Sequence, residues 1–431
     1  MASGCTSNTD GPRIINTTES DAETVPQTDK KTPSSQPEST PTPETAGDRS
    51  VIRYPGRLLD DMQDVSEWYV DAGRKTVDAS RGYVGSRSMR LEAAGGVDIS
   101  INRDFSSTSL SNQVPVFAFK TDSPDSISTE VQVNAPSASD CRVYGNQSFS
   151  IQSPTGWFLL SLGLSKVNGT PDLSDPGTLV FRVNNGSSSE ITVWLGGLFA
   201  VEKPDRGYLV LNWDDGNATR YSKAFQDMRE FGYPGVSSVP TAQIGEGSRL
   251  TIDEMKSMRD ELGWEFISHT HNNENVLGLS ESEMRTEFAE SRAWLRGDNE
   301  QGESFSQGAD HIIFPFVNFD DRVLDIASEY FNTAGSNTGN YLHGMPARGF
   351  DPMAVNRVEG NDLDGLKTLL ERTAIERQAA IINFHNFDAP NTLSRNEFQS
   401  FLTDLHDNYT STGDIEVVTM SQLYEIRRGG A

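Results

Sequence analysis

The chain has 431 residues, enough for two domains and a terminal tail. Its formal net charge of -26 argues against nucleic acid as a natural partner, because the phosphate backbone would repel it. Lysine is scarce, and arginine carries most of the basic charge. Many carboxylates with few lysines are typical of proteins from very salty surroundings, so we expect a halophilic protein, with an ordinary acidic secreted protein as the alternative.

Residues 1–50 are rich in Thr, Ser, Pro, Asp and Glu and have almost no large apolar side chains. Such a segment cannot bury enough surface to offset its ordering entropy, so we predict a disordered stalk. Cys5 follows Ala2-Ser3-Gly4, which resembles the cleavage site of a lipoprotein signal, although no apolar segment precedes it. We therefore predict an extracellular or surface-attached protein, with a lipid on Cys5 as one means of membrane contact.

Residues 51–205 are predicted to be all-β. Short apolar or alternating runs recur between turn signals, and this spacing favours a β-sandwich. The segments Leu59–Trp68 and Gly85–Leu91 resemble jelly-roll carbohydrate-binding modules of the galactose-binding-like type. Three tryptophans of this region are expected either to stack on sugars or to fill the sandwich core, and these are Trp68, Trp157 and Trp194.

From residue 206 to residue 431 the pattern changes to apolar strands that alternate with amphipathic helices. Strands are predicted at Leu209–Trp213, Val236–Val239, Phe266–Ser268, His311–Phe314, Ala380–Phe384 and Ile415–Val418. Thr251, Ser280 and Ser394 are each followed by Glu three residues later, a capping-box pattern that predicts three helix starts. Repeated β/α units of this length predict a barrel or an open parallel sheet, in which ligands collect at the carboxyl ends of the strands.

Residues that suit metal-assisted hydrolysis follow three of these predicted strands. Asp214-Asp215-Gly216 ends the first strand, His269-Thr270 ends the third, and His385 ends the fifth. A carboxylate pair and two histidines at equivalent places are the groups that a metal-dependent hydrolase needs. The pattern therefore predicts a hydrolytic metal site at the mouth of the barrel or at the edge of the sheet.

In order and spacing these motifs resemble the polysaccharide deacetylase (NodB-type carbohydrate esterase) family across residues 206–431. The resemblance implies a distorted (β/α) barrel that removes N-acetyl or O-acetyl groups from an acetylated polysaccharide with the help of a divalent metal. We expect Zn²⁺, with Co²⁺, Ni²⁺ and Mn²⁺ as alternatives. Together with the acidic composition, this leads us to expect a haloarchaeal enzyme.

The resemblance also implies a role for each motif residue. Asp214 is then the general base, Asp215 and His269 bind the metal, and His385 is the general acid that protonates the leaving sugar nitrogen. The third ligand of the family is a histidine four residues after the first, a spacing that places both on one helical face. Asn273 stands at that position here, and its oxygen would bind zinc-like metals more weakly than imidazole. The alternatives are His271 as the third ligand, or a vacant site.

The third family motif consists of an Arg or an aromatic residue, followed by Pro and another aromatic residue. Phe314-Pro315-Phe316 keeps the Pro-aromatic part, while the Arg that orients the base in many relatives is absent. We expect Phe314, Pro315, Phe316 and Trp213 to bind the substrate, with core packing as the alternative for the two phenylalanines. The segment from Phe350 to Arg357 resembles the region in which relatives place an Arg or Asp that supports the catalytic residues.

Two other functions stay open. The chain could be a glycan-binding surface protein that keeps the deacetylase fold but has lost a working metal site together with the second histidine. It could also be a metal-dependent amidohydrolase that acts on a small amide, although small soluble substrates need neither a stalk nor a sandwich. Position 273 separates the first alternative from an active enzyme, because Asn273→His should raise turnover only where the other catalytic parts are intact.

Overall fold

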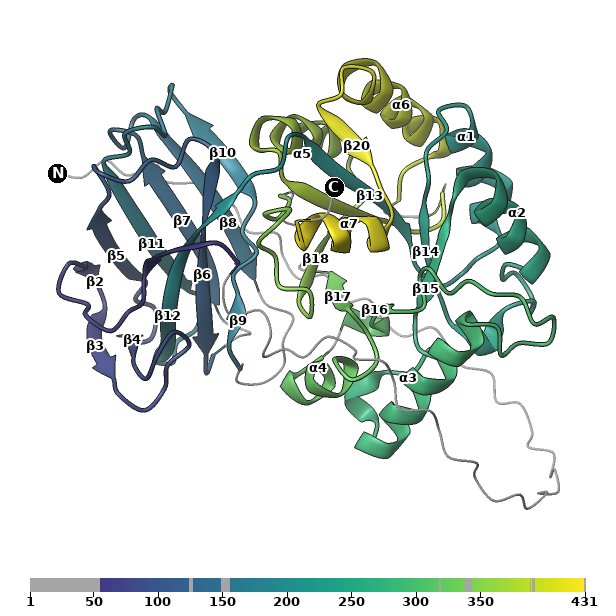
Figure 1. Ribbon diagram of the computed structural model, residues 1–431, viewed down its shortest axis with the longest axis horizontal. Helices are drawn as coiled ribbons and strands as arrows, with labels where there is room; N and C mark the ends of the chain where they lie inside the picture. Colours follow the sequence, from purple (N-terminus) through teal and green to yellow (C-terminus); the bar gives the residue numbers. More distant parts are fainter. Residues whose placement is uncertain are drawn as a thin grey trace.

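The computed structural model describes residues 55–123, 127–148, 156–317, 319–337, 343–387, 389 and 392–429. The predicted stalk, with Cys5, lies outside these residues. No helix in the described part of the chain is both long and apolar enough to cross a bilayer. Figure 1 shows antiparallel sheets formed by the first part of the chain and a parallel sheet flanked by helices formed by the second part.

Antiparallel strands form two six-stranded sheets between residues 57 and 202. The first sheet contains β1 Arg57–Asp60, β3 Arg74–Asp78, β4 Ser88–Ala93, β6 Gln113–Thr121, β9 Phe158–Leu159 and β12 Ile191–Glu202. The second contains β2 Tyr69–Ala72, β5 Ile99–Asp104, β7 Ile127–Asn134, β8 Cys141–Ser148, β10 Leu164–Asn168 and β11 Thr178–Asn185. Buried apolar side chains from both sheets belong to one core, so the sheets pack face to face as a β-sandwich.

Two of the three tryptophans considered for sugar stacking are buried. Trp68 belongs to the sandwich core, whereas Trp194 is not part of that core and is covered by Arg81, which lies 4.6 Å from its ring centroid. Trp68 is 1% exposed and Trp194 is 2% exposed, and the indole N–H of each donates to a carboxylate, Asp60 at 2.8 Å and Asp78 at 2.9 Å. Their rings therefore stabilise the fold and are not available to stack on a sugar. Trp157 is half-buried.

Seven parallel strands close into a barrel, because β13 pairs with both β14 and β19. The barrel strands are β13 Gly207–Trp213, β14 Val236–Val239, β15 Glu265–Ser268, β16 His311–Ile313, β17 Thr333–Asn337, β18 Val355–Glu359 and β19 Ala379–Phe384. The eighth strand, β20 Ile415–Val417, pairs with β13 outside the closed ring. The predicted combination of a β-sandwich and a distorted (β/α) barrel is confirmed, although two barrel strands, β17 and β18, lie where no strand was predicted.

Helices cover the outside of the barrel (Figure 1). They are α1 Phe225–Arg229, α2 Ile252–Leu262, α3 Glu281–Leu295, α4 Asp321–Ala327, α5 Leu363–Glu376, α6 Arg395–Leu405 and α7 Met420–Arg427. Shorter helical turns are η3 Arg220–Ala224, η4 Thr241–Gln243, η5 Val276–Gly278, η6 Pro315–Val317 and η7 His406–Thr410. The three predicted capping boxes are present at Thr251, Ser280 and Ser394. Each such cap stabilises its helix by about 1 kcal/mol.

Successive side chains of β13 point alternately to the outside and to the inside of the barrel. Leu209, Leu211 and Trp213 pack in the cluster shared with the helices, whereas Tyr208 and Val210 belong to the cluster inside the barrel. Residues two apart in a strand point to the same side, so Asn212 and then Asp214 continue the inner face toward the carboxyl end. The strand thus delivers Asp214 to the mouth of the barrel.

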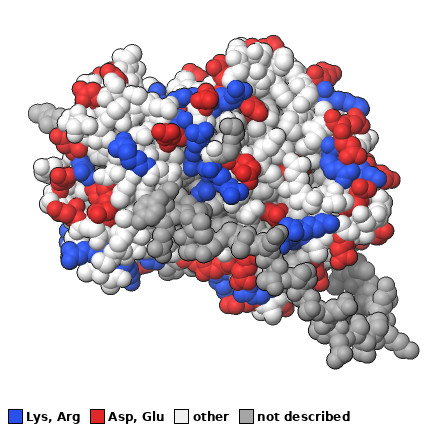
Figure 2. Space-filling model, in the orientation of Figure 1, with Lys and Arg blue, Asp and Glu red and all other residues white. Residues whose placement is uncertain are grey.

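Figure 2 shows Asp and Glu side chains spread over both parts of the molecule in this view. A distributed acidic surface agrees with the composition, but it does not distinguish a halophilic protein from an ordinary acidic one. The halophilic origin therefore stays a prediction.

Candidate active site at the mouth of the barrel

Asp214 is buried at the carboxyl end of β13, among hydrogen-bond donors from two other strands. Ser238 on β14 donates its hydroxyl to Oδ1 at 2.5 Å. Arg357 on β18 donates from both terminal nitrogens, to Oδ1 at 2.7 Å and to Oδ2 at 2.9 Å, and also donates to the Asn212 side-chain oxygen. A two-point guanidinium contact fixes the plane of the carboxylate as well as its position.

The charge state of Asp214 follows from these contacts. Burial alone would raise the pKa of Asp214, but the Arg357 guanidinium, with help from His269 and the Ser238 hydroxyl, holds that pKa well below its usual range. The carboxylate is therefore ionised at every physiological pH. A general base must be in this state before it can accept a proton.

The depressed pKa of Asp214 makes its contribution to stability depend on pH. In the unfolded chain the carboxyl titrates near pH ~3.9 and in the folded chain it titrates lower, so its stabilising effect is present above about pH 4 and is lost as pH falls through the folded pKa. The difference in unfolding free energy between wild type and Asp214→Asn should therefore shrink by roughly 1 kcal/mol between pH 6 and pH 3. Urea unfolding at both pH values measures this, and an unchanged difference would count against the ion pair.

Asp215 lies in a different environment from its neighbour. Its side chain is 43% exposed, and its Oδ1 lies 3.8 Å from Nε2 of His269. Asp215 has φ of 69° and Gly216 has φ of 58°, so the chain makes a left-handed turn directly after the strand. The carbonyls of Asp214 and Asp215 accept hydrogen bonds from the buried Arg220 and from Arg249, respectively, and these bonds hold the turn.

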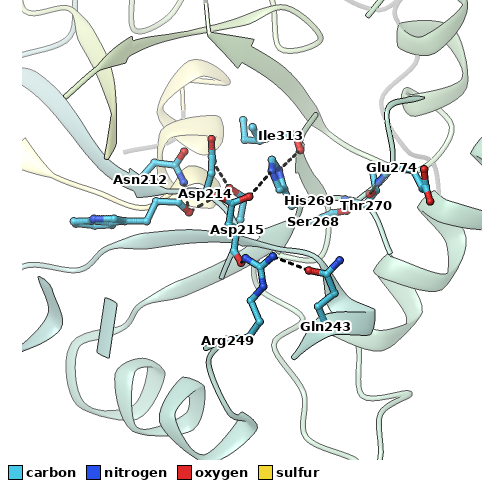
Figure 3. Close-up of polar contacts among 12 residues, drawn as sticks. Asn212, Asp214, Asp215, Gln243, Arg249, Ser268, His269, Thr270, Glu274 and Ile313 are labelled. Carbon is cyan, nitrogen blue, oxygen red and sulfur yellow. Dashed lines mark hydrogen bonds and ion pairs between the residues drawn. The ribbon is translucent and has the colours of Figure 1, made fainter. Parts of the chain in front are cut away.

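His269 follows β15 and faces Asp215 across the mouth (Figure 3). Its Nδ1 lies 2.8 Å from the Ile313 carbonyl oxygen, to which it donates, so the lone pair of a neutral ring is at Nε2, the atom that faces Asp215. Burial lowers the pKa of His269, against the opposing effect of the two carboxylates. A neutral imidazole oriented by a backbone carbonyl is the form in which histidine binds metals.

Asn273 and His271 differ clearly as candidates for a third ligand. Oδ1 of Asn273 is buried and has no hydrogen-bond partner among the described residues. The His271 ring is engaged elsewhere, with Nδ1 at 2.8 Å from the Thr241 hydroxyl and Nε2 at 3.6 Å from a carboxylate oxygen of Glu290. Asn273 therefore offers an oxygen with no partner in the described part of the chain, whereas the His271 ring is turned toward Thr241 and Glu290.

The helical spacing expected between His269 and Asn273 is wrong, because the segment that joins them is not helical. Thr270 has φ of 60° and Asn273 has φ of 64°, so the chain turns through left-handed conformations at both positions. The buried carboxylate of Glu287 accepts from the backbone N–H groups of His271 and Asn272 and so stabilises this turn.

The three candidate ligands are of chemical types that suit a divalent metal. In the described ranges, no group of three or more His, Cys, Asp and Glu side chains is placed to hold a metal. Asp215 and His269 supply two donors of these types, and the orphaned amide oxygen of Asn273 is a donor of a different type. Carboxylate, imidazole and amide oxygen together suit a divalent ion, which would also satisfy an oxygen that otherwise loses its hydrogen bond on burial.

His385 lies beyond the end of β19, beside a carboxylate that the sequence analysis missed. Its Nδ1 is 3.6 Å from Oε2 of Glu359, the last residue of β18, and 46% of the His385 side chain is exposed. Burial raises the pKa of Glu359, while His385 and Arg357 oppose that effect. The one sequence signal for Glu359 is that a glycine, Gly360, follows it, as Gly216 follows Asp215.

Arg357 corrects the expectation that the arginine orienting the base is absent. The third motif lacks it, but β18 brings Arg357 to Asp214 from a later part of the chain. The segment from Phe350 to Arg357, expected to support the catalytic residues, does contain this contact. Ser238 and Arg220 had no sequence signal, since neither belongs to a motif.

Three of the four residues expected to bind substrate are buried, so that expectation is wrong for them. Trp213 is 1% exposed and stacks between Trp264 and Phe384, because it precedes Asp214 and points to the opposite face of β13. Phe314 is also 1% exposed, and Pro315 is buried. Phe316, at φ of 60°, is 60% exposed and remains available to a ligand.

Comparison with known proteins gives one match to a family model. Residues 202–334 match the polysaccharide deacetylase family. The matched segment includes Asp214, Asp215, His269 and Asn273. It ends before β18, which carries Arg357 and Glu359, and before His385, which follows β19.

One relative is YxkH of Bacillus subtilis (strain 168), described provisionally as a polysaccharide deacetylase. It is 25% identical over 128 residues, which are 30% of this chain and 43% of the relative, so the match spans less than half of that protein's length. Among solved structures, the deacetylase PplD of Streptococcus pyogenes is 24% identical with a TM-score of 0.30, covering 35% of this chain and 62% of that one. The chitin deacetylase of Colletotrichum lindemuthianum is 15% identical with a TM-score of 0.35, covering 51% and 89%.

Proposed function

We propose, from the premise that residues 202–334 form a polysaccharide deacetylase domain, that this protein hydrolyses acetyl groups on a polysaccharide at the mouth of its barrel. The observation that carries the proposal is the division of labour between two adjacent carboxylates. Asp214 is buried and paired with Arg357, whereas Asp215 is open and faces the imidazole of His269. A hydrolase needs one carboxylate to accept a proton and another to bind a cation, and a purely structural pair has no need of this difference.

Asp215, His269 and Asn273 would hold a divalent metal, which when bound supplies the Lewis acidity that polarises an acetyl carbonyl. Asp214 accepts the proton of the attacking water, and Arg357 with Ser238 keeps its carboxylate ionised and correctly turned. His385 gives a proton to the departing nitrogen or oxygen of the sugar. Oε2 of Glu359 lies 3.6 Å from Nδ1 of His385 and is placed to orient the imidazole ring.

Phe316 follows β16 and is 60% exposed, and we assign it the role of contacting the sugar ring. An acetylated polysaccharide is the substrate class that follows from the family of the domain. Action on such a polymer agrees with the predicted extracellular or surface-attached location and with a β-sandwich in residues 51–205. Lipid attachment at Cys5, a halophilic source and zinc as the metal remain parts of the proposal.

Acetate release by the purified chain in concentrated salt tests the proposed activity. We expect acetate from N-acetylglucosamine oligomers or from O-acetylated xylan oligomers, and the two substrates distinguish N-deacetylation from O-deacetylation. EDTA should abolish release, and Zn²⁺ or Co²⁺ should restore it. Asp215→Asn is the matched variant, and it should be inactive with or without added metal. Acetate release that survives both EDTA and Asp215→Asn would contradict a metal-dependent mechanism.

A glycan-binding protein without turnover is the second candidate, favoured by the amide at position 273 in place of a stronger ligand. Asn273→His is expected to raise zinc affinity at least about tenfold, because imidazole binds zinc-like ions more tightly than an amide oxygen. Equilibrium dialysis measures affinity, and acetate release measures whether turnover rises with it. His271→Asn is the control and should leave affinity unchanged, since its ring is held by Thr241 and Glu290. A loss of affinity in this control would instead identify His271 as the ligand.

A further inference from the structure

Among the described residues, one connection between neighbouring barrel strands contains no helix. A helix lies in each of the connections β13–β14, β14–β15, β15–β16, β16–β17 and β18–β19. The described residues of the β17–β18 connection, 343–354, contain none. The β-sandwich lies beside this part of the barrel in Figure 1. Its segment Leu159–Leu164 contacts β18 and the connection before it.

Hydrogen bonds join this sandwich segment to β18 and to the connection before it. The side-chain amide of Asn356, on β18, donates to the Ser161 carbonyl oxygen at 3.1 Å. The backbone N–H of Asp351 donates to the Ser161 hydroxyl at 3.0 Å, and the Asp351 carboxylate accepts from the backbone N–H of Leu159 at 3.0 Å. Ser161 and Asn356 are both buried, so these bonds are shielded from water.

The backbones of the two parts also approach each other closely. A Cβ placed on Gly163 would lie 2.1 Å from the carbonyl oxygen of Gly344, and one on Gly344 would lie 2.2 Å from that of Ala379 on β19. The Leu164 N–H donates to the Gln378 side chain at 2.7 Å. The sandwich segment, the β17–β18 connection and β19 therefore lie so close together that no side chain fits between them. Only glycine can occupy positions 163 and 344 at such short distances.

The apolar core is continuous across the same boundary. One cluster of buried side chains includes Val116 and Leu159 of the sandwich together with Ile312, Phe314 and Met353 of the barrel. Two independently folded modules would each close their own core and meet through a more polar interface.

We propose that the β-sandwich is a wall of the barrel, covering the side where residues 343–354 form no helix, and that Asn356 ties β18, which carries Arg357, to this wall. Neighbouring residues of a strand point to opposite sides, so Asn356 reaches outward to Ser161 while Arg357 reaches inward to Asp214. Displacement of the sandwich would move the guanidinium that holds Asp214. The sandwich would support β18 in this way whether or not the protein releases acetate.

Hydrogen–deuterium exchange on the full chain tests whether the sandwich supports β18. In Asn356→Ala, the amides of Val355–Glu359 and of Leu159–Leu164 should both exchange at least tenfold faster than in wild type. The control is Asn184→Ala, which removes a hydrogen bond to Ser128 within the sandwich and should leave both segments unchanged. Faster exchange of Val355–Glu359 alone, or of neither segment, would overturn the proposal.

Two further measurements keep the test decisive if Asn356→Ala does not fold. Ser161→Ala removes only the hydroxyl that accepts from Asp351, and it should increase exchange of the same two segments. In wild type, sandwich and barrel amides should lose protection at the same urea concentration. Exchange of the whole sandwich at a urea concentration that leaves the barrel strands protected would show two independent modules.

Discussion

Replacing Asp214 with Asn is expected to lower kcat for acetate release by about 10³-fold while the protein still binds metal. The substitution keeps the size of the side chain and removes its ability to accept a proton. Because Asp214 has no direct part in the proposed ligand set, equilibrium dialysis should give the wild-type zinc content.

The matched variant, Asp215→Asn, should differ in metal binding, because it should lose the metal as well as the activity. Asp214→Asn leaves the buried Arg357 without its anionic partner, so kcat must be compared below the melting temperature of the variant. A kcat within tenfold of wild type for Asp214→Asn, in a folded protein with bound metal, would remove Asp214 from the role of base.

Glu376→Ala is expected to lower the free energy of unfolding by about 3–5 kcal/mol, the largest stability effect we expect from a single substitution. Glu376 is the last residue of α5 and is buried where the barrel meets the sandwich. Its carboxylate contacts Arg142, the Tyr144 hydroxyl at 3.0 Å and the Lys203 ammonium at 2.5 Å. Removing it would leave two largely buried cations with no opposite charge.

Urea unfolding of wild type, Glu376→Ala and a control variant measures this effect. The control is Glu425→Ala, which removes an ion pair with Arg428 in which both side chains are more than half exposed, and it should change stability by less than about 1 kcal/mol. Salt screens exposed pairs more strongly than buried ones, so the effect of Glu376→Ala should persist at high salt. Equal effects for the two variants would show that Glu376 contributes no more than a surface charge.

Most of the barrel could be predicted from the sequence, because its strands are apolar and its helices begin with capping boxes. The strands β17 and β18 could not, since Thr333-Ala-Gly-Ser-Asn337 has no apolar pattern and β18 carries the polar residues Asn356 and Arg357. These polar residues are tolerated because one bonds to the sandwich and the other to Asp214. Tertiary contacts, not local pattern, make this segment a strand.

The sequence predicts where Asp214, His269 and His385 lie, but it does not predict the contacts that support them. Asp214, His269 and His385 each follow a strongly apolar strand, so their common location follows from strand direction alone. Arg357 is 143 residues from Asp214 in the chain, and only closure of the barrel brings them together. The burial of Trp213, by contrast, could have been foreseen, because a residue next to an inward-pointing Asp214 must point outward.

The central claim is that the mouth of the barrel binds one divalent cation between a base and an acid. Anomalous diffraction from crystals soaked in Zn²⁺ tests it most directly. We expect one strong zinc peak within about 2.0–2.2 Å of the Asp215 carboxylate and Nε2 of His269, with the Asn273 oxygen as the third protein ligand. No zinc at the mouth under saturating conditions, or zinc bound only elsewhere, would contradict the account.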